Sequence, residues 1–127
     1  MRWRAYAQAN RVTHFARWCE HYLVQSVDQF AGEPLVLEEW QLEFMGEALA
    51  TRDEAGLEPV FASTALVVGR KNGKTSMLAA YALYRLFNDQ TQPEILLAAA
   101  SDKQAGRLFD SCVGFIRRSA ELSELAV

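Results

Sequence analysis

The segment that most constrains this chain is a short apolar run followed by a tight loop and a helix-forming stretch. Residues 63–68 (STALVV) contain β-branched members and predict a buried strand. Residues 69–73 form a loop with a glycine at each end, and residues 74–87 are rich in Ala, Leu, Met and Tyr, which predicts a helix. A strand, a glycine loop and a helix in this order present backbone N–H groups to a phosphate.

Gly73, Lys74 and Thr75 form the centre of the predicted phosphate-binding loop. The glycine lets the backbone approach the anion, the lysine reaches the β- and γ-phosphates, and the hydroxyl ligates Mg²⁺. The pattern G-x-x-x-x-G-K-[ST] is not met in full, because its first glycine falls on Val68 and Gly69 comes one position late. The alternative is a basic surface turn, since Asn-Gly is a common turn signal. The flanking strand and helix favour the phosphate site.

The loop itself adds further cations. We predict that its residues bind ATP together with Lys74 and Thr75; they are Gly69, Arg70, Lys71, Asn72 and Gly73. Arg70 and Lys74 are the candidate catalytic residues, because a fixed cation at Arg70 neutralises charge that develops on the γ-phosphate. The alternative for Arg70 is a solvated loop arginine. Thr75 is the predicted Mg²⁺ ligand.

The rest of the chain predicts helices around a second strand. Residues 94–100 (EILLAAA) form the second apolar run and predict a buried strand. Apolar spacing and capping residues predict further helices, over residues 8–31, over 38–50, and from Ser101 or Asp102 toward Ser119. This order predicts an α/β fold in which a crossover helix joins parallel strands.

Composition bounds the class of protein. The chain has 127 residues, of which 50% are hydrophobic and 23% charged, as in one ordinary globular domain. The net charge of −3 gives no global basic footprint for nucleic acid, although a local basic patch is compatible with it. There is no secretory segment, no run of about 20 apolar residues, and the cysteines are far apart in sequence. We therefore expect a soluble cytoplasmic protein with reduced thiols and no membrane span.

Three segments together resemble the N-terminal ATPase region of the terminase large subunit of tailed phages, the DNA-packaging motor. They are residues 31–44 (AGEPLVLEEWQLEF), 65–86 (ALVVGRKNGKTSMLAAYALYRL) and 94–109 (EILLAAASDKQAGRLF). In that family a phosphate loop of the R-K-N-G-K-[ST] kind is usual, so the missing first glycine favours the resemblance. The resemblance implies a P-loop NTPase fold, with a parallel sheet between two layers of helices.

The resemblance also implies two parts and further site residues. Residues 1–62 would be an N-terminal helical segment with an adenine-recognition element, and residues 63–127 the first part of the ATPase core. Trp40 and Gln41 match that element, and the Gln41 amide offers a donor and an acceptor to the adenine edge. The alternatives are core packing for Trp40 and a surface position for Gln41. A DNA contact is the less favoured role of Lys103 and Gln104, behind helix capping and solvation.

The function that the resemblance implies is ATP-driven packaging of viral double-stranded DNA into the capsid. ATP and Mg²⁺ would be the cofactors, and a homo-oligomeric ring would work with a small terminase subunit and the capsid portal. The full protein would also be an endonuclease. No apolar strand ending in Asp-Glu follows residue 75, so the Mg²⁺ aspartate and the water-activating glutamate are missing. We therefore expect an incomplete core that does not turn over ATP by itself.

Two other functions stay open at this point. One is a helicase-like or other P-loop ATPase, which shares the phosphate loop. The other is a prophage remnant that binds nucleotide or a partner without catalysis.

Overall fold

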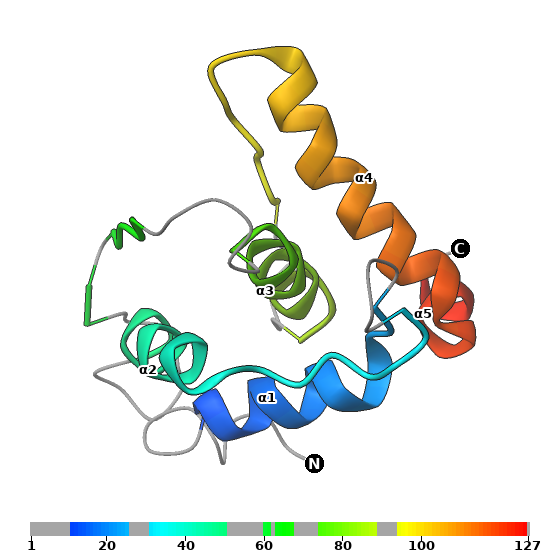
Figure 1. Ribbon diagram of the computed structural model, residues 1–127, viewed down its shortest axis with the longest axis horizontal. Coiled ribbons are helices and arrows are strands. Elements are labelled where there is room, and N and C mark those ends of the chain that lie inside the picture. The colour runs from blue at the N-terminus through cyan, green and yellow to red at the C-terminus, as the bar shows by residue number, and fades with distance from the viewer. Residues whose placement is uncertain are drawn as a thin grey trace.

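The computed structural model describes residues 11–25, 31–50, 60–61, 63–67, 74–88 and 94–126. Within these ranges lie α1 (Arg11–Tyr22), α2 (Glu39–Ala48), α3 (Lys74–Asn88), α4 (Asp102–Arg118) and α5 (Ala120–Leu125). Figure 1 shows α3 at the centre, with α1 and α2 below and to the left and α4 to the upper right. The central helix packs against α1 and α4, α1 packs against α2, and α4 against α5. None of the described helices is long and apolar enough to cross a membrane.

The first helix is shorter than predicted. It ends at Tyr22, although the apolar spacing predicts a helix over residues 8–31. The chain beyond it pairs with a later extended piece, because Leu23 O accepts from Leu35 N at 2.9 Å. The helix prediction is therefore wrong for residues 23–25, whose carbonyl oxygens accept hydrogen bonds from groups outside the helix.

The core is built around Tyr84 of α3, which is fully buried. Its ring packs edge to face on Phe15 and Trp18 of α1, with centroid separations of 5.0 and 5.6 Å. Its hydroxyl shares a hydrogen bond of 2.7 Å with Nδ1 of His14. Phe15 and Trp18 thus lie on the face of α1 that contacts α3. Because these contacts come from one end of α3, that end is fixed to α1.

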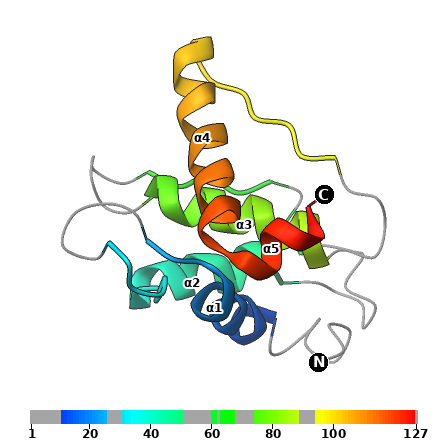
Figure 2. The same cartoon turned by 90° about the vertical axis from the view of Figure 1, so that its right-hand side faces the viewer.

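The fourth helix is attached to the third along its second half. Ser101 Oγ accepts from Gln104 N at 3.3 Å, which confirms Ser101 as the residue that caps α4. Phe115 is buried, and Cys112 Sγ lies 3.9 Å from the carbonyl oxygen of Ala79 on α3. Figure 2 shows the first turns of α4 standing away from the other helices, so only its later part belongs to the core.

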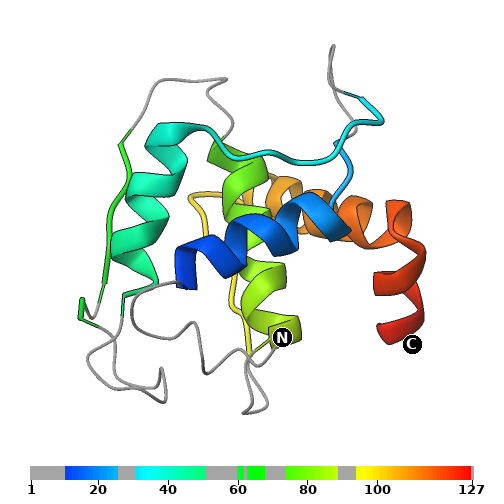
Figure 3. The same cartoon turned by 90° about the horizontal axis from the view of Figure 1, so that it is seen from below.

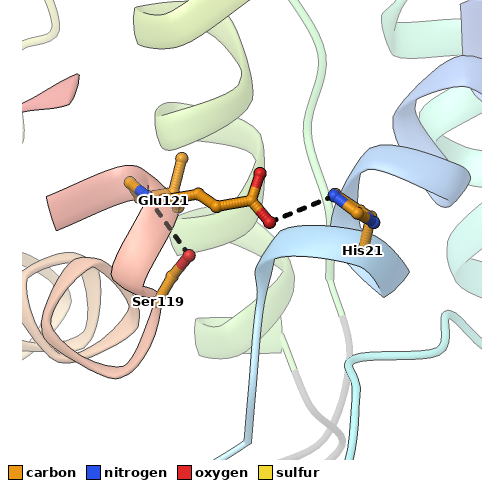
Figure 4. A network of polar contacts seen from close by, with 4 residues as sticks. His21, Ser119 and Glu121 are labelled. Atoms are coloured by element: carbon orange, nitrogen blue, oxygen red, sulfur yellow. Dashed lines mark hydrogen bonds and ion pairs between the residues drawn. The ribbon is translucent and has the colours of Figure 1, made fainter. Parts of the chain in front are cut away.

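The short α5 was not predicted from the sequence. It begins after Ser119, whose hydroxyl accepts from Leu122 N at 3.3 Å, and Leu122 is buried. Figure 4 shows Glu121 reaching from α5 to His21 at the end of α1, with 3.4 Å between Oε1 and Nε2. A serine at the start of a helix is a sequence signal, and here it begins a second helix where the predicted one ends.

The described residues contain no β-strand, so the predicted parallel sheet is not confirmed. Residues 63–67 and 94–99, where the strands were expected, run as open traces without ladder partners. Figures 1 and 3 place the first beside α2, whereas the second leads into α4. A strand is stable only when its backbone groups pair with a neighbour. Because the two segments lie apart, neither supplies that neighbour for the other.

The buried His14 predicts that the stability of the protein depends on pH. Burial is the main cause that lowers the pKa of His14 below its ordinary value of 6.5, and nearby positive charges, among them that of Arg11, lower it further. The folded state therefore holds His14 neutral, whereas the unfolded chain takes up a proton once the pH falls below 6.5. We expect the free energy of unfolding to decrease as the pH falls from 6.5 toward the lowered pKa, by at most about 1.4 kcal/mol per pH unit from this group.

Urea denaturation at a series of pH values measures this dependence. The control is His14→Phe, which keeps a ring beside Tyr84 and removes the titrating group. This variant should show a shallower loss of stability over the same range. Equal slopes for the two proteins would contradict the assignment to His14.

Candidate functional site

The first turn of α3 is the part of the predicted phosphate site that the structure describes. Lys74 and Thr75 begin the helix, as the sequence predicts, with Lys74 half-buried and Thr75 exposed. The first N–H groups of a helix have no partner within it, and they give this end a positive dipole. Within the described part of the chain, neither side chain makes a hydrogen bond or an ion pair. The ammonium group and the hydroxyl are therefore available to an anion and its metal.

The loop before this helix lies outside the described residues. That loop holds the other predicted ATP-binding residues, Gly69, Arg70, Lys71, Asn72 and Gly73. Their predicted roles, including catalysis by Arg70, stay predictions.

The position of α3 follows from the side chains that it buries. Met77, Ala80 and Leu83 face the core together with Tyr84, and all four are almost fully buried. The buried residues of α3 begin at Met77, so the first turn of the helix lies outside the core and is accessible. The packing therefore fixes the helix and exposes its positive end.

An open hollow of about 410 Å³ adjoins this first turn. Thr75 and Ser76 line it from α3, and Gln25 lines it from the chain after α1. The other five lining residues belong to α4; they are Arg107, Asp110, Ser111, Phe115 and Arg118. Two guanidinium groups against one carboxylate make the hollow cationic. Sequence reasoning missed these α4 residues, because only the packing of α4 on α3 brings them beside Thr75.

Gln41 lies in the first turn of α2 and is buried rather than on the surface, with 5% of its side chain exposed. Its Oε1 accepts from the backbone N–H of Glu38 at 2.8 Å, so the amide stabilises the start of its own helix. Figures 2 and 3 show that α2 and α3 begin on the same side of the molecule. The predicted adenine-binding residue, in the first turn of α2, thus lies on the same side of the molecule as the start of α3.

Trp40 is half-buried and packs against the core, as its alternative role requires. Its indole Nε1 donates to Oε2 of Glu38 at 2.7 Å, which holds the ring at the start of α2. Stacking on a base stays a prediction for this residue.

The two candidate DNA contacts lie in the first turn of α4. Lys103 and Gln104 are exposed there, and the backbone N–H of Gln104 donates to the Ser101 cap. The capping role of this segment is confirmed, and a contact with DNA stays a prediction.

Three comparisons with known proteins bear on this site. A family model described as "Terminase large subunit, ATPase domain" matches residues 39–126, which include the first turns of α2 and α3. The crystal structure of the HK97 bacteriophage large terminase is similar in fold, with a TM-score of 0.64 and 22% sequence identity over 90% of this chain. The chain spans 22% of the length of that terminase. No curated protein matches the sequence.

The hydrogen bond of Gln41 predicts a cost in stability when its amide is removed. We expect Gln41→Ala to lower the free energy of unfolding by about 1 kcal/mol, because the N–H of Glu38 loses its acceptor at the helix start. Chemical denaturation measures the change. Glu43→Ala is the matched control, since Glu43 is exposed on the same helix, and it should have little effect. A loss in the control as large as in Gln41→Ala would show that the hydrogen bond is not its cause.

Proposed function

We propose that this chain, which belongs to the family of terminase large-subunit ATPase domains, binds ATP with Mg²⁺ at the start of α3 and forms part of a motor that packages viral double-stranded DNA. The observation that carries the proposal is the position of Lys74 and Thr75. They open a well-anchored helix directly after the RKNG segment, with both side chains free of partners among the described residues. A phosphate-binding lysine and a metal-binding hydroxyl need this place at a helix start.

The chemistry of the first turn fits a magnesium–nucleotide complex. The ammonium of Lys74 suits the oxygens of the β- and γ-phosphates, and the exposed hydroxyl of Thr75 is a hard oxygen ligand of the kind that Mg²⁺ takes. The loop residues Gly69, Lys71, Asn72 and Gly73 would supply backbone donors, and Arg70 would neutralise charge on the γ-phosphate.

The adenine-recognition role of Gln41 is part of the same proposal. Its support is that α2 and α3 begin on one side of the molecule, as Figures 2 and 3 show. The Oε1 of Gln41 accepts from the N–H of Glu38, and a glutamine amide is the type of group that offers a donor and an acceptor to the adenine edge. Trp40 would support this arrangement by holding the helix start.

The wider role is inferred from the family. The packaging motor would be a homo-oligomeric ring on the capsid portal, with a small terminase subunit and double-stranded DNA as partners. The same inference includes an endonuclease activity of the full protein and assembly in the cytoplasm. It also includes the division of this chain into a helical segment, residues 1–62, and the first part of the ATPase core, residues 63–127. A helicase-like ATPase is less favoured, because the family match extends over residues 39–126.

A binding role without catalysis is the second candidate for this chain. No apolar stretch ending in Asp-Glu follows the phosphate loop in its sequence. ATP hydrolysis in this class needs such a pair to hold Mg²⁺ and to orient the attacking water. We therefore propose that this chain alone binds nucleotide, and that hydrolysis requires the acidic pair from additional sequence.

Titration with a fluorescent ATP analogue in Mg²⁺ tests the proposal. We expect saturable binding by this chain and a dissociation constant at least about tenfold larger for Lys74→Ala, because a hydrogen bond to a charged group is lost. Lys103→Ala is the matched control, since Lys103 is an exposed lysine at the start of another helix, and it should bind as the parent does. Equal affinity of the parent and the Lys74 variant would refute the phosphate site.

The role of Thr75 has its own test. Thr75→Ala removes the proposed metal ligand, so adding Mg²⁺ should strengthen nucleotide binding less in this variant than in the parent. The measurement is the same titration with Mg²⁺ and with a chelator. An unchanged effect of Mg²⁺ would show that Thr75 does not hold the metal.

A further inference from the structure

We propose that Arg107 of α4 contacts the terminal phosphate of the nucleotide bound at the start of α3. This inference rests on the proposed function, and it adds a residue that lies far from the phosphate loop in sequence. Arg107 lines the same hollow as Thr75 and Ser76, the residues of the first turn of α3. The hollow measures about 410 Å³ and is open to solvent on one side, so a phosphate group can enter it.

The position of Arg107 is set by the packing of α4 on α3. Phe115 is buried between the helices, and Cys112 approaches Ala79 at 3.9 Å. Ser111 lies one helical turn after Arg107 and lines the same hollow, so both face the same way from α4. Arg107 is therefore carried by a helix whose later turns pack on the core, rather than by a loop.

The two arginines of the hollow differ in what they already bind. The Nε of Arg118 donates to the carbonyl oxygen of Val24 at 2.7 Å, and its guanidinium lies over the ring of Phe115. Arg107 is exposed and makes no hydrogen bond or ion pair in the part of the chain that the structure describes. Asp110 shares the hollow but forms no ion pair there with Arg107. Arg107 thus keeps all of its donors for a ligand.

The place of the hollow identifies which part of the nucleotide Arg107 would contact. Thr75 would hold Mg²⁺ through its hydroxyl, and the metal would neutralise charge at the terminal phosphates. A cation that shares a hollow with this hydroxyl lies at the metal and terminal-phosphate end of the ligand, away from the base. Arginine presents several donors in a planar fork, which matches the oxygens of a phosphate. The inference therefore predicts discrimination between ATP and ADP.

Competition with the fluorescent ATP analogue tests this, with unlabelled ATP or ADP in Mg²⁺ as competitors. We expect Arg107→Ala to weaken ATP binding by about tenfold and ADP binding by less than about twofold. Arg107→Lys keeps the charge and loses the fork, so it should recover part of the affinity for ATP. Arg117→Ala is the matched control, because Arg117 is an exposed arginine of the same helix outside the hollow. Circular dichroism of each variant checks that it is folded like the parent chain.

The outcomes separate this inference from the function on which it rests. If Lys74→Ala abolishes binding while Arg107→Ala behaves like the Arg117 control, the phosphate site stands and the role of Arg107 is overturned. An equal loss for ATP and ADP in Arg107→Ala also overturns it, because the terminal phosphate is then not the group contacted. If the parent chain binds neither nucleotide, the proposed function fails and the inference fails with it.

Discussion

The contact of Tyr84 with α1 is the interaction on which the rest of the structure depends. Its buried ring meets Phe15 and Trp18, and its hydroxyl meets His14. Aromatic pairs of this geometry contribute beyond the area that they bury, and a buried hydroxyl needs its partner. Since Tyr84 lies toward the end of α3, the contact holds the helix by one end. The opposite end begins with Lys74, which is half-buried, and Thr75, which is exposed.

The helices were largely predictable from the sequence because their apolar residues recur at helical spacing. The start of α3 at Lys74 and the Ser101 cap of α4 are both confirmed. The end of α1 at Tyr22 was not predictable, because it depends on the pairing of Leu23 with Leu35. Strand formation depends in the same way on a partner. The apolar character of residues 63–68 and 94–100 predicts burial in a sheet, but a sequence run does not say whether its neighbour is present.

The site shows the same division between local and distant information. Local chemistry predicts a phosphate site at Lys74 and Thr75, because a glycine, a lysine and a hydroxyl in sequence at a helix start are typical of phosphate binding. Arg107 gave no such signal, since an arginine on a helix is most often a solvated residue. Its place beside Thr75 follows from the packing of Phe115 and Cys112 of α4 against the core. Gln41 was predicted to contact adenine because it matches the adenine-recognition element and carries an amide. Its burial and its hydrogen bond with Glu38 were visible only in the structure.

The charge of the chain makes the local arrangement decisive for anion binding. With a net charge of −3 the protein as a whole repels a triphosphate, so any attraction must come from nearby groups. The start of α3 supplies a positive helix end and the ammonium of Lys74, and the adjoining hollow supplies Arg107 and Arg118 against Asp110 alone. These charges come from two helices that pack against each other. Salt screens the electrostatic potential of these charges within about 8–10 Å at physiological ionic strength. The attraction for an anion is therefore confined to the region around the first turn of α3.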